Sequence, residues 1–345
     1  MKKISIALSL IMGLTFNTNA QSVDQETGDN LVRPIQISVI PPLSTNGIQS
    51  MQYSNRLSFN IFGGLAGGLD GAEFSGLFAV ERGRVKGIQF AGITNIVGSN
   101  VEGIQSAGII NLVDGELKGI QFAGIINIAG QGMRGAQFAG ISNIAANVEG
   151  VQAAGIINIS AGNVKGIQIG LINLASHVDG VQLGLLNFAK DGYRRGEVWV
   201  GDALHANIGF KMGGNSKLYN IFTVGSALPA ESSTRWGFGY GLGTNFDLGK
   251  KSQLSIEGIS YQIRENGNSR ETLNLLNQLR SSFIFPLKGR LALTVTPTFN
   301  VQVSQFKAND GQIGTNWVGW NVYDKLVNGK TRVMMWPGLN VGIQF

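Results

Sequence analysis

The sequence has no cysteine, and only two histidines and 7 prolines occur among its 345 residues. Without cysteine, the chain forms no disulfide bond, holds no metal through thiolates and carries no lipid on an N-terminal cysteine. Neither His177 nor His205 has a metal-ligand partner at a usual sequence spacing. We therefore expect no metal site and no cofactor.

Charges and catalytic motifs are also sparse. Charged residues make up 14% of the chain, and the net charge of +6 is not clustered, so nucleic acid is not an expected partner. The nucleophile motif Gly-x-Ser-x-Gly is absent. The glycine-rich segment 237–243 lacks the Lys-Ser/Thr pair and helix of a phosphate loop. These absences predict a protein that is not an enzyme and has no catalytic residues.

The first 20 residues predict a secretory signal peptide. Lys2 and Lys3 precede an apolar stretch from Ile4 to Leu14, and the small residues at 18–20 are typical of a cleavage site. The apolar stretch is shorter than the roughly 20 residues that a transmembrane helix needs. We expect export to the cell envelope and a mature chain of 325 residues (345 minus 20).

Glycine, in contrast, is abundant, with 50 residues or about twice the usual ~7% share. Many of these glycines belong to a repeated phrase, Gly-h-Gln-x-Ala-Gly-h-x-Asn-h, in which h is apolar; the clearest copy is Gly87–Ile96. Two glycines per repeat would cost a helix about 1 kcal/mol each, so the repeats predict β structure. Eight units, at spacings of 16, 16, 16, 16, 15, 16 and 14 residues, begin at Leu69, Val85, Val101, Leu117, Met133, Val148, Val164 and Val178.

Each unit fits either a long strand of an antiparallel meander or one coil of a parallel β-solenoid. The meander is favoured by two unequal faces, one larger and apolar and one smaller and more polar, as in a barrel wall. The solenoid is favoured by the lengths of the units. Gln89 and Asn95 are six residues apart, but Gln168 and Asn173 are five apart. In a straight strand this deletion would move Asn173 to the other face, whereas a corner at the Ala-Gly step absorbs it.

Recurrent amides also favour the solenoid. Parallel in-register stacking places identical side chains above one another, where amides form hydrogen-bonded ladders. We expect these amides to be structural. The predicted ladder residues are Gln89, Gln105, Gln121, Gln137, Gln152, Gln168 and Gln182, together with Asn95, Asn111, Asn127, Asn143, Asn158, Asn173 and Asn187.

From about residue 192 the pattern changes to long segments that alternate with period two. In the segment 291–304, apolar residues such as Leu293 occupy one face and polar residues such as Thr294 occupy the other. The segment 200–211 alternates in the same way and predicts a continuous strand. The segment 307–332 is expected to be a long polar loop.

The last residues predict how the chain ends its fold. Leu339, Val341, Ile343 and Phe345 follow one another at two-residue steps, and a terminal aromatic is typical of the closing strand of bacterial outer-membrane β-barrels. We therefore interpret Phe345 as a barrel-assembly signal. The alternative is a soluble β-sandwich whose last strand happens to end in phenylalanine.

Together these patterns predict an all-β protein in which a β-solenoid-like stack is joined to a C-terminal antiparallel β-barrel or sheet. The alternative is one continuous outer-membrane antiparallel β-barrel. The expected segments are the signal peptide (1–20), a leader with the first strands (21–68), the repeats (69–191) and the barrel-like region (192–345).

The repeat phrase resembles that of the LA-2272-type bacterial surface repeat proteins. The resemblance covers roughly residues 57–345 and includes the segments 236–244 and 276–280. It implies a secreted or envelope location, and it assigns no activity to any residue.

The sequence leads to three functional hypotheses. The first is a non-enzymatic cell-envelope protein, in the outer membrane or at the cell surface, that acts as a structural or binding module for a glycan or protein. The second is an outer-membrane β-barrel that serves as a pore or an anchor. The third is a soluble periplasmic β protein. The outer membrane is the expected partner in the first two hypotheses.

Overall fold

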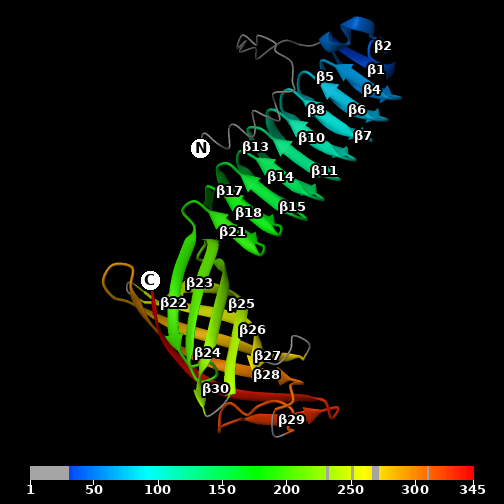
Figure 1. Cartoon of the computed structure of the whole chain (residues 1–345). Coiled ribbons are helices and arrows are strands. Elements are labelled where there is room, and N and C mark those ends of the chain that lie inside the picture. Colours follow the sequence, from blue (N-terminus) through cyan, green and yellow to red (C-terminus); the bar gives the residue numbers. More distant parts are fainter. Residues whose placement is uncertain (1–30, 231–232, 250–251, 266–271, 309–310) are drawn as a thin grey trace.

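The computed structural model describes residues 31–230, 233–249, 252–265, 272–308 and 311–345. The predicted signal peptide lies outside these residues. The predicted all-β fold is confirmed, with 72% strand and 2% helix. A parallel β-solenoid is followed by a closed antiparallel barrel of eight strands, as Figure 1 shows. Within the described residues, no helix has the length and apolar character needed to cross a membrane.

The solenoid consists of two parallel sheets that face each other. Each coil contributes a long strand to the first sheet and a short strand to the second. The first sheet contains β1 (Leu31–Ile40), β2 (Leu43–Ser44), β3 (Tyr53–Asn60), β5 (Gly68–Ser75), β7 (Val85–Ala91), β9 (Val101–Ala107), β11 (Glu116–Ala123), β13 (Gly132–Ala139), β15 (Val148–Ala154), β17 (Asn163–Ile169), β19 (His177–Val178) and β20 (Val181–Leu183). The second contains β4 (Gly63–Ala66), β6 (Phe78–Glu81), β8 (Thr94–Val97), β10 (Ile110–Val113), β12 (Ile126–Ala129), β14 (Ser142–Ala145), β16 (Ile157–Ser160), β18 (Ile172–Ala175) and β21 (Leu186–Ala189).

Neighbouring coils pair in register, so that each residue lies beside its equivalent in the next repeat. Gln89 pairs with Gln105 in the first sheet, and Asn95 pairs with Asn111 in the second. The corner between the sheets lies between Ala91 and Thr94, at the predicted Ala-Gly step. This parallel register excludes the antiparallel meander and the single continuous barrel.

The glycine that opens each repeat is required by the spacing of the coils. Gly119 has a φ of +144°, and a Cβ atom built on it would lie 1.8 Å from the carbonyl oxygen of Gly103 in the preceding coil. Any side chain would therefore meet backbone. This explains why the glycine recurs at one position of every unit, where it allows the coils to stack at strand spacing.

The solenoid begins earlier than the first recognisable repeat. β1 and β3 pair in parallel and continue the first sheet, so the described part of the predicted leader segment belongs to the stack. A short 3-10 helix, η1 (Gly47–Gln52), precedes β3, and β2 pairs antiparallel with β1. The antiparallel pairing at this end interrupts the repeating geometry, as expected of a cap.

The barrel is closed by pairing between its first and last strands, β22 and β30. It is therefore a barrel rather than an open sheet. Its strands are β22 (Tyr193–Val200), β23 (Ala206–Asn215), β24 (Leu218–Ala230), β25 (Ser233–Asp247), β26 (Gln253–Glu265), β27 (Asn274–Pro286), β28 (Ala292–Ser304) and β30 (Thr331–Gln344).

Two local expectations for this region are wrong. The segment 200–211 is not one strand, because the chain turns between Val200 and Ala206. The Asp202 carboxylate fixes this turn by accepting hydrogen bonds from the backbone N–H of Ala203 and the indole of Trp336. The segment 307–332 is not entirely loop, because β29 (Tyr323–Val327) pairs with β30 at the rim far from the solenoid (Figure 1).

Candidate functional site

The solenoid interior contains two continuous ladders of hydrogen-bonded amides. All fourteen predicted ladder residues lie in these ladders, and all are buried. Consecutive glutamines are joined by bonds of 2.7–2.9 Å between Nε2 and Oε1. Consecutive asparagines are joined by bonds of 2.8–3.0 Å between Nδ2 and Oδ1. The amides are thus structural groups whose polar atoms are largely satisfied by their equivalents.

The two ladders run in opposite directions. Each glutamine donates to the preceding coil, as Gln105 does to Gln89, whereas each asparagine donates to the following coil, as Asn95 does to Asn111. At the start of each ladder, an acceptor is left over. Within the described residues, Oδ1 of Asn95 and Oε1 of Gln182 are the ladder atoms that have no hydrogen-bond partner.

The donor ends of the ladders are closed by specific acceptors. Gln89 donates to the Glu73 carboxylate at 2.8 Å, and Glu73 stands where every later coil has glutamine. Asn187 donates to Oδ1 of Asn220, which belongs to β24 of the barrel. The asparagine ladder therefore ends outside the solenoid, and it joins the two modules through a hydrogen bond.

Glu73 has a buried acidic neighbour, Glu81. Burial raises the pKa of Glu73, although hydrogen bonds from Gln89 and Asn60 oppose this. Burial raises the pKa of Glu81 further, and the charge of Glu73 adds to the effect. Among the described residues, no group donates a hydrogen bond to either Glu81 oxygen. A protonated Glu81 can instead donate to Glu73, so the pair is stable as one carboxylate and one carboxylic acid.

The two histidines lie in turn regions of the two modules. His177 lies at the polar turn edge of the solenoid, where Asp179 and Asp191 contact its two ring nitrogens at 2.9 and 2.5 Å. Its side chain is exposed, and hydrogen bonds to Asp191 and then Asp179 raise its pKa. His205 lies in the turn between β22 and β23. Among the described residues, no group of three or more His, Cys, Asp or Glu side chains is placed to hold a metal ion.

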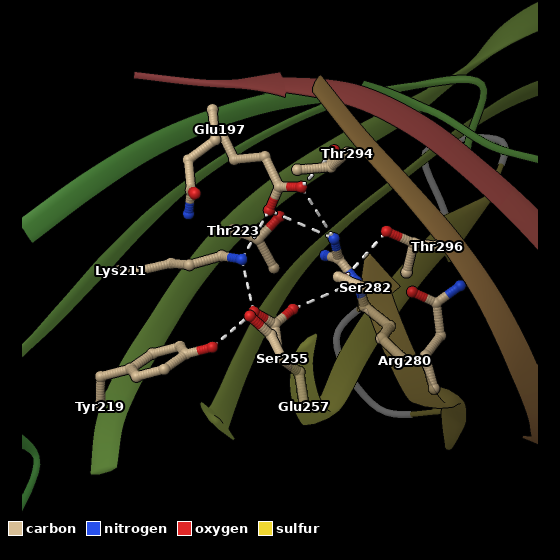
Figure 2. A network of polar contacts seen from close by, with 12 residues as sticks. Glu197, Lys211, Tyr219, Thr223, Ser255, Glu257, Arg280, Ser282, Thr294 and Thr296 are labelled. Carbon is tan, nitrogen blue, oxygen red and sulfur yellow. Dashed lines mark hydrogen bonds and ion pairs between the residues drawn. The ribbon is translucent and has the colours of Figure 1, made fainter. Parts of the chain in front are cut away.

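The barrel interior holds a group of four mutually contacting charges, which Figure 2 shows. Glu197 on β22, Lys211 on β23, Glu257 on β26 and Arg280 on β27 point toward one another, and all four are fully buried. Lys211 contacts both carboxylates, with its Nζ atom 2.8 Å from Oε2 of Glu197. The Nη2 atom of Arg280 lies 3.2 Å from Oε2 of Glu197, and its Nε atom lies 3.4 Å from Oε2 of Glu257. Two cations therefore balance two anions.

Hydroxyl groups and an aromatic ring complete this charge cluster. Tyr219 donates to Glu257 at 2.8 Å, and Thr294 donates to Glu197 at 3.0 Å. The Arg280 guanidinium lies 4.3 Å from the centre of the Trp199 ring. Such contacts offset part of the desolvation cost of buried charges. The charges and the two hydroxyl groups together link six strands, β22, β23, β24, β26, β27 and β28, across the barrel interior.

The charge cluster was not foreseen from the sequence. Its members are spread over more than 80 positions, with Glu197 and Arg280 separated by 83 residues. A signal was nevertheless present, because Lys211 on β23 and Arg280 on β27 are each the one charged residue on the inward-facing side of their strand. A lone charge at such a position needs a partner inside the barrel.

The outer face of the barrel has the opposite character. Apolar side chains that point outward are exposed on most strands, including Val200 (61%) and Ile208 (59%). Phe345, the predicted assembly signal, lies at the end of β30, where its backbone N–H and C=O each bond to Gly196 at 2.9 Å. The terminal residue thus takes part in barrel closure, and its role in assembly stays a prediction.

No protein-family model, curated protein or solved structure matches this chain.

Proposed function

We propose that this protein is a non-enzymatic outer-membrane protein whose barrel is a closed anchor for the solenoid. The observation that carries the proposal is the reversed polarity of the barrel. Its interior contains buried charges, and its exterior carries exposed apolar residues. In a soluble protein this arrangement would leave a large apolar surface in water. The apolar belt includes Val198, Ile208, Phe210, Val224, Phe238, Leu242, Leu279, Phe283, Phe299, Leu339 and Val341.

The filled lumen supports an anchor over a pore. A barrel of eight strands has an interior just wide enough for side chains to fill. Here the charge cluster closes that space, and Trp336, Tyr261 and Leu276 are also fully buried in the barrel. We infer that water and solutes do not pass through. A soluble periplasmic protein is disfavoured by the apolar belt.

The lengths of the connections support one orientation. At the solenoid rim, the strands are joined by short segments, 216–217, 248–252 and 287–291. The opposite rim carries the longest connection, 305–330, which contains β29 (Figure 1). Outer-membrane barrels have short periplasmic turns and longer extracellular loops. We therefore place the solenoid on the periplasmic side and β29 on the cell surface.

The solenoid then acts as a structural or binding module beneath the membrane. Its polar side carries a charged residue at one equivalent position of every coil, and Arg134 at this position pairs with Glu149 of the next coil at 3.3 Å. Arg134 also lies 3.3 Å from Glu116, which is next to this position in the preceding coil. This charged column is the surface we assign to a protein or glycan partner. It consists of Asp70, Lys86, Glu102, Lys118, Arg134, Glu149, Lys165 and Asp179.

Location and orientation can be tested separately. The folded protein should partition with the outer membrane, require detergent for extraction and migrate faster on a gel before heating than after. Full solubility in plain buffer would refute the anchor. Because the chain has no cysteine, Asn328→Cys and Lys118→Cys each introduce a single thiol.

A membrane-impermeant maleimide reports on orientation. It should label Asn328→Cys on intact cells, and it should label Lys118→Cys only after the outer membrane is permeabilised. Labelling of Lys118→Cys on intact cells would reverse the orientation and leave the anchor in place.

A further inference from the structure

A wide apolar surface covers the corner of the solenoid. Five residues per coil point outward around this corner, from the long strand through the turn to the short strand. In the first coil they are Ala72, Phe74, Leu77, Phe78 and Val80, and in the last they are Val181, Leu183, Leu185, Leu186 and Phe188. We call this surface the corner ridge. Over its eight coils, every residue is apolar except Thr94, Ser106 and Ser142.

The corner ridge is larger than an ordinary surface patch. Eight coils at strand spacing span about 34 Å along the stack. Around the corner, the chain from the first to the last ridge residue of a coil spans about 26 Å. The resulting area of roughly 900 Å² exceeds the ~300–600 Å² of a typical largest apolar patch. The ridge is exposed at both ends of the stack, with 40% exposure at Leu77 and 45% at Leu185. Stacked rings such as Phe122 and Phe138, 5.3 Å apart, continue along it.

The backbone at the corner is suited to an apolar environment. The backbone N–H of Gly92 donates to the carbonyl oxygen of Ser75 at 3.1 Å, and that of Ile93 donates to the carbonyl oxygen of Leu77 at 2.7 Å. These backbone N–H groups are therefore paired with the preceding coil. The amide side chains behind the ridge point inward to the ladders. These N–H groups therefore do not depend on water for a partner, which favours contact with lipid.

The last coil brings the ridge to the lipid-facing wall of the barrel. Met212 and Asn220 point outward from β23 and β24, yet both are buried at the solenoid rim. Asn220 donates to the corner carbonyl of Gly184 at 2.8 Å and to the hydroxyl of Tyr240. Further along the same strands, the outward positions are Phe222 and Val224 of the apolar belt. The solenoid thus contacts the outside of the wall, and its ridge meets the belt.

We propose that the corner ridge lies on the acyl chains of the membrane leaflet next to the solenoid, which rests on the assignment of the barrel to the membrane. The ridge then continues the apolar belt along the leaflet, and the charged column faces water. A long surface with one apolar and one charged side is the arrangement by which amphipathic elements lie in a membrane interface. The solenoid is held along the membrane rather than projecting freely from it.

The test uses single cysteines that carry an environment-sensitive fluorophore, with the protein folded into phosphatidylcholine vesicles whose acyl chains bear a nitroxide quencher. Phe238→Cys reports on the barrel belt. Leu171→Cys and Ile141→Cys report on the ridge. Lys165→Cys, in the same coil as Leu171, is the matched control on the charged column.

We expect fluorescence to be lost at Leu171 and Ile141 to an extent close to that at Phe238, and to be retained at Lys165. Quenching at Phe238 with none at the ridge would overturn the inference and leave the anchor intact. No quenching at Phe238 would refute the anchor itself. Ridge labels that are shielded from water without being quenched, together with disulfide formation between copies, would assign the ridge to a second copy of the chain and overturn the inference.

Charge substitutions give a second test. Ile156→Glu and Leu171→Glu replace exposed ridge residues, so the coil is expected to fold, as circular dichroism can verify. Together they should abolish quenching at Ile141→Cys, whereas Lys165→Glu should leave it unchanged. Undiminished quenching in the folded double variant would contradict contact between the ridge and lipid.

Discussion

The solenoid and the barrel both bury polar groups beside an apolar core, but they satisfy those groups in different ways. In the solenoid, parallel register places each residue beside its equivalent, so the interior uses amides, which both donate and accept. In the barrel, antiparallel strands place unlike residues opposite one another, so Lys211 can meet Glu197 and Glu257. Amide side chains can pair with copies of themselves, which suits the repeated coils. Charged side chains need partners of opposite sign, which the unlike neighbours in the barrel provide.

The largest effect should follow from breaking the barrel cluster. Lys211→Met leaves two buried carboxylates with one cation, and loss of one partner of a buried ion pair costs about 3–5 kcal/mol. Unfolding by urea in lipid vesicles, with the gel-mobility shift as readout, measures the free energy of unfolding. Lys288→Met, at an exposed rim turn, should change it little. Equal stability of both variants would show that the charge cluster does not hold the barrel together.

Alanine substitutions at one solenoid glycine and one barrel glycine test whether the close approach of neighbouring coils requires glycine. Gly119→Ala in the solenoid should destabilise by about 2–4 kcal/mol, because the new Cβ atom meets the Gly103 carbonyl and the backbone is strained at positive φ. Gly258→Ala on β26 should be nearly neutral, since no atom lies within 4 Å of its added Cβ. Calorimetric melting of both variants tests the difference. Similar losses would contradict the close approach between coils.

The ladders predict that position within the stack matters. Asn127→Leu removes bonds to Asn111, Asn143 and the Phe138 carbonyl. Asn95→Leu removes bonds to Asn111 and the Ser106 carbonyl, one fewer. At about 1 kcal/mol per bond, Asn127→Leu should cost about 2–3 kcal/mol and Asn95→Leu about 1 kcal/mol less. Thermal unfolding followed by circular dichroism compares them. If both variants melt together with the unchanged protein, the ladders do not stabilise the stack.

The smallest effect concerns pH. Burial raises the pKa of Glu81 in the folded state above the ordinary 4.5, so stability is greatest below that value and falls as pH rises through the folded-state pKa. Glu81→Val restores the residue type of the equivalent Val97. It should stabilise the solenoid by about 1–2 kcal/mol at pH 7 by removing the desolvation cost of a buried acid.

Urea midpoints from pH 4 to 8 test this expectation. The Glu81→Val profile should be flatter than that of the unchanged protein, and Glu102→Val on the charged column serves as the exposed control. Parallel profiles for all three proteins would show that Glu81 titrates normally.

The solenoid could be predicted from the sequence because its geometry depends on repetition. The deletion between Gln168 and Asn173 located the corner, and the recurring amides fixed the register. Glu81 was overlooked although alignment of the units places it opposite Val97. In this first coil the repeat fails at Glu73, Ala79 and Glu81, where the second coil has Gln89, Asn95 and Val97.

The barrel was predictable only in outline. Alternation in segments such as 291–304 indicated strands with a polar and an apolar face, but alternation does not determine which distant strands become neighbours. Closure depends on the pairing of β22 with β30, and the charge cluster depends on that closure. Sequence reasoning therefore had no means to bring Glu197 and Arg280 together. It also missed the turn at Asp202, whose stabilising partner Trp336 lies 134 residues away.

The two amide ladders have their donor ends at opposite ends of the stack, so a coil can be added between them without changing either end. Glu73 ends one ladder at the cap, Asn220 ends the other at the barrel, and every coil between them has the same donors and acceptors. Duplication of one 16-residue unit would leave both endings intact and extend the stack by about 4.8 Å. A change in repeat number alone would therefore alter the distance that the solenoid covers and leave the barrel unchanged.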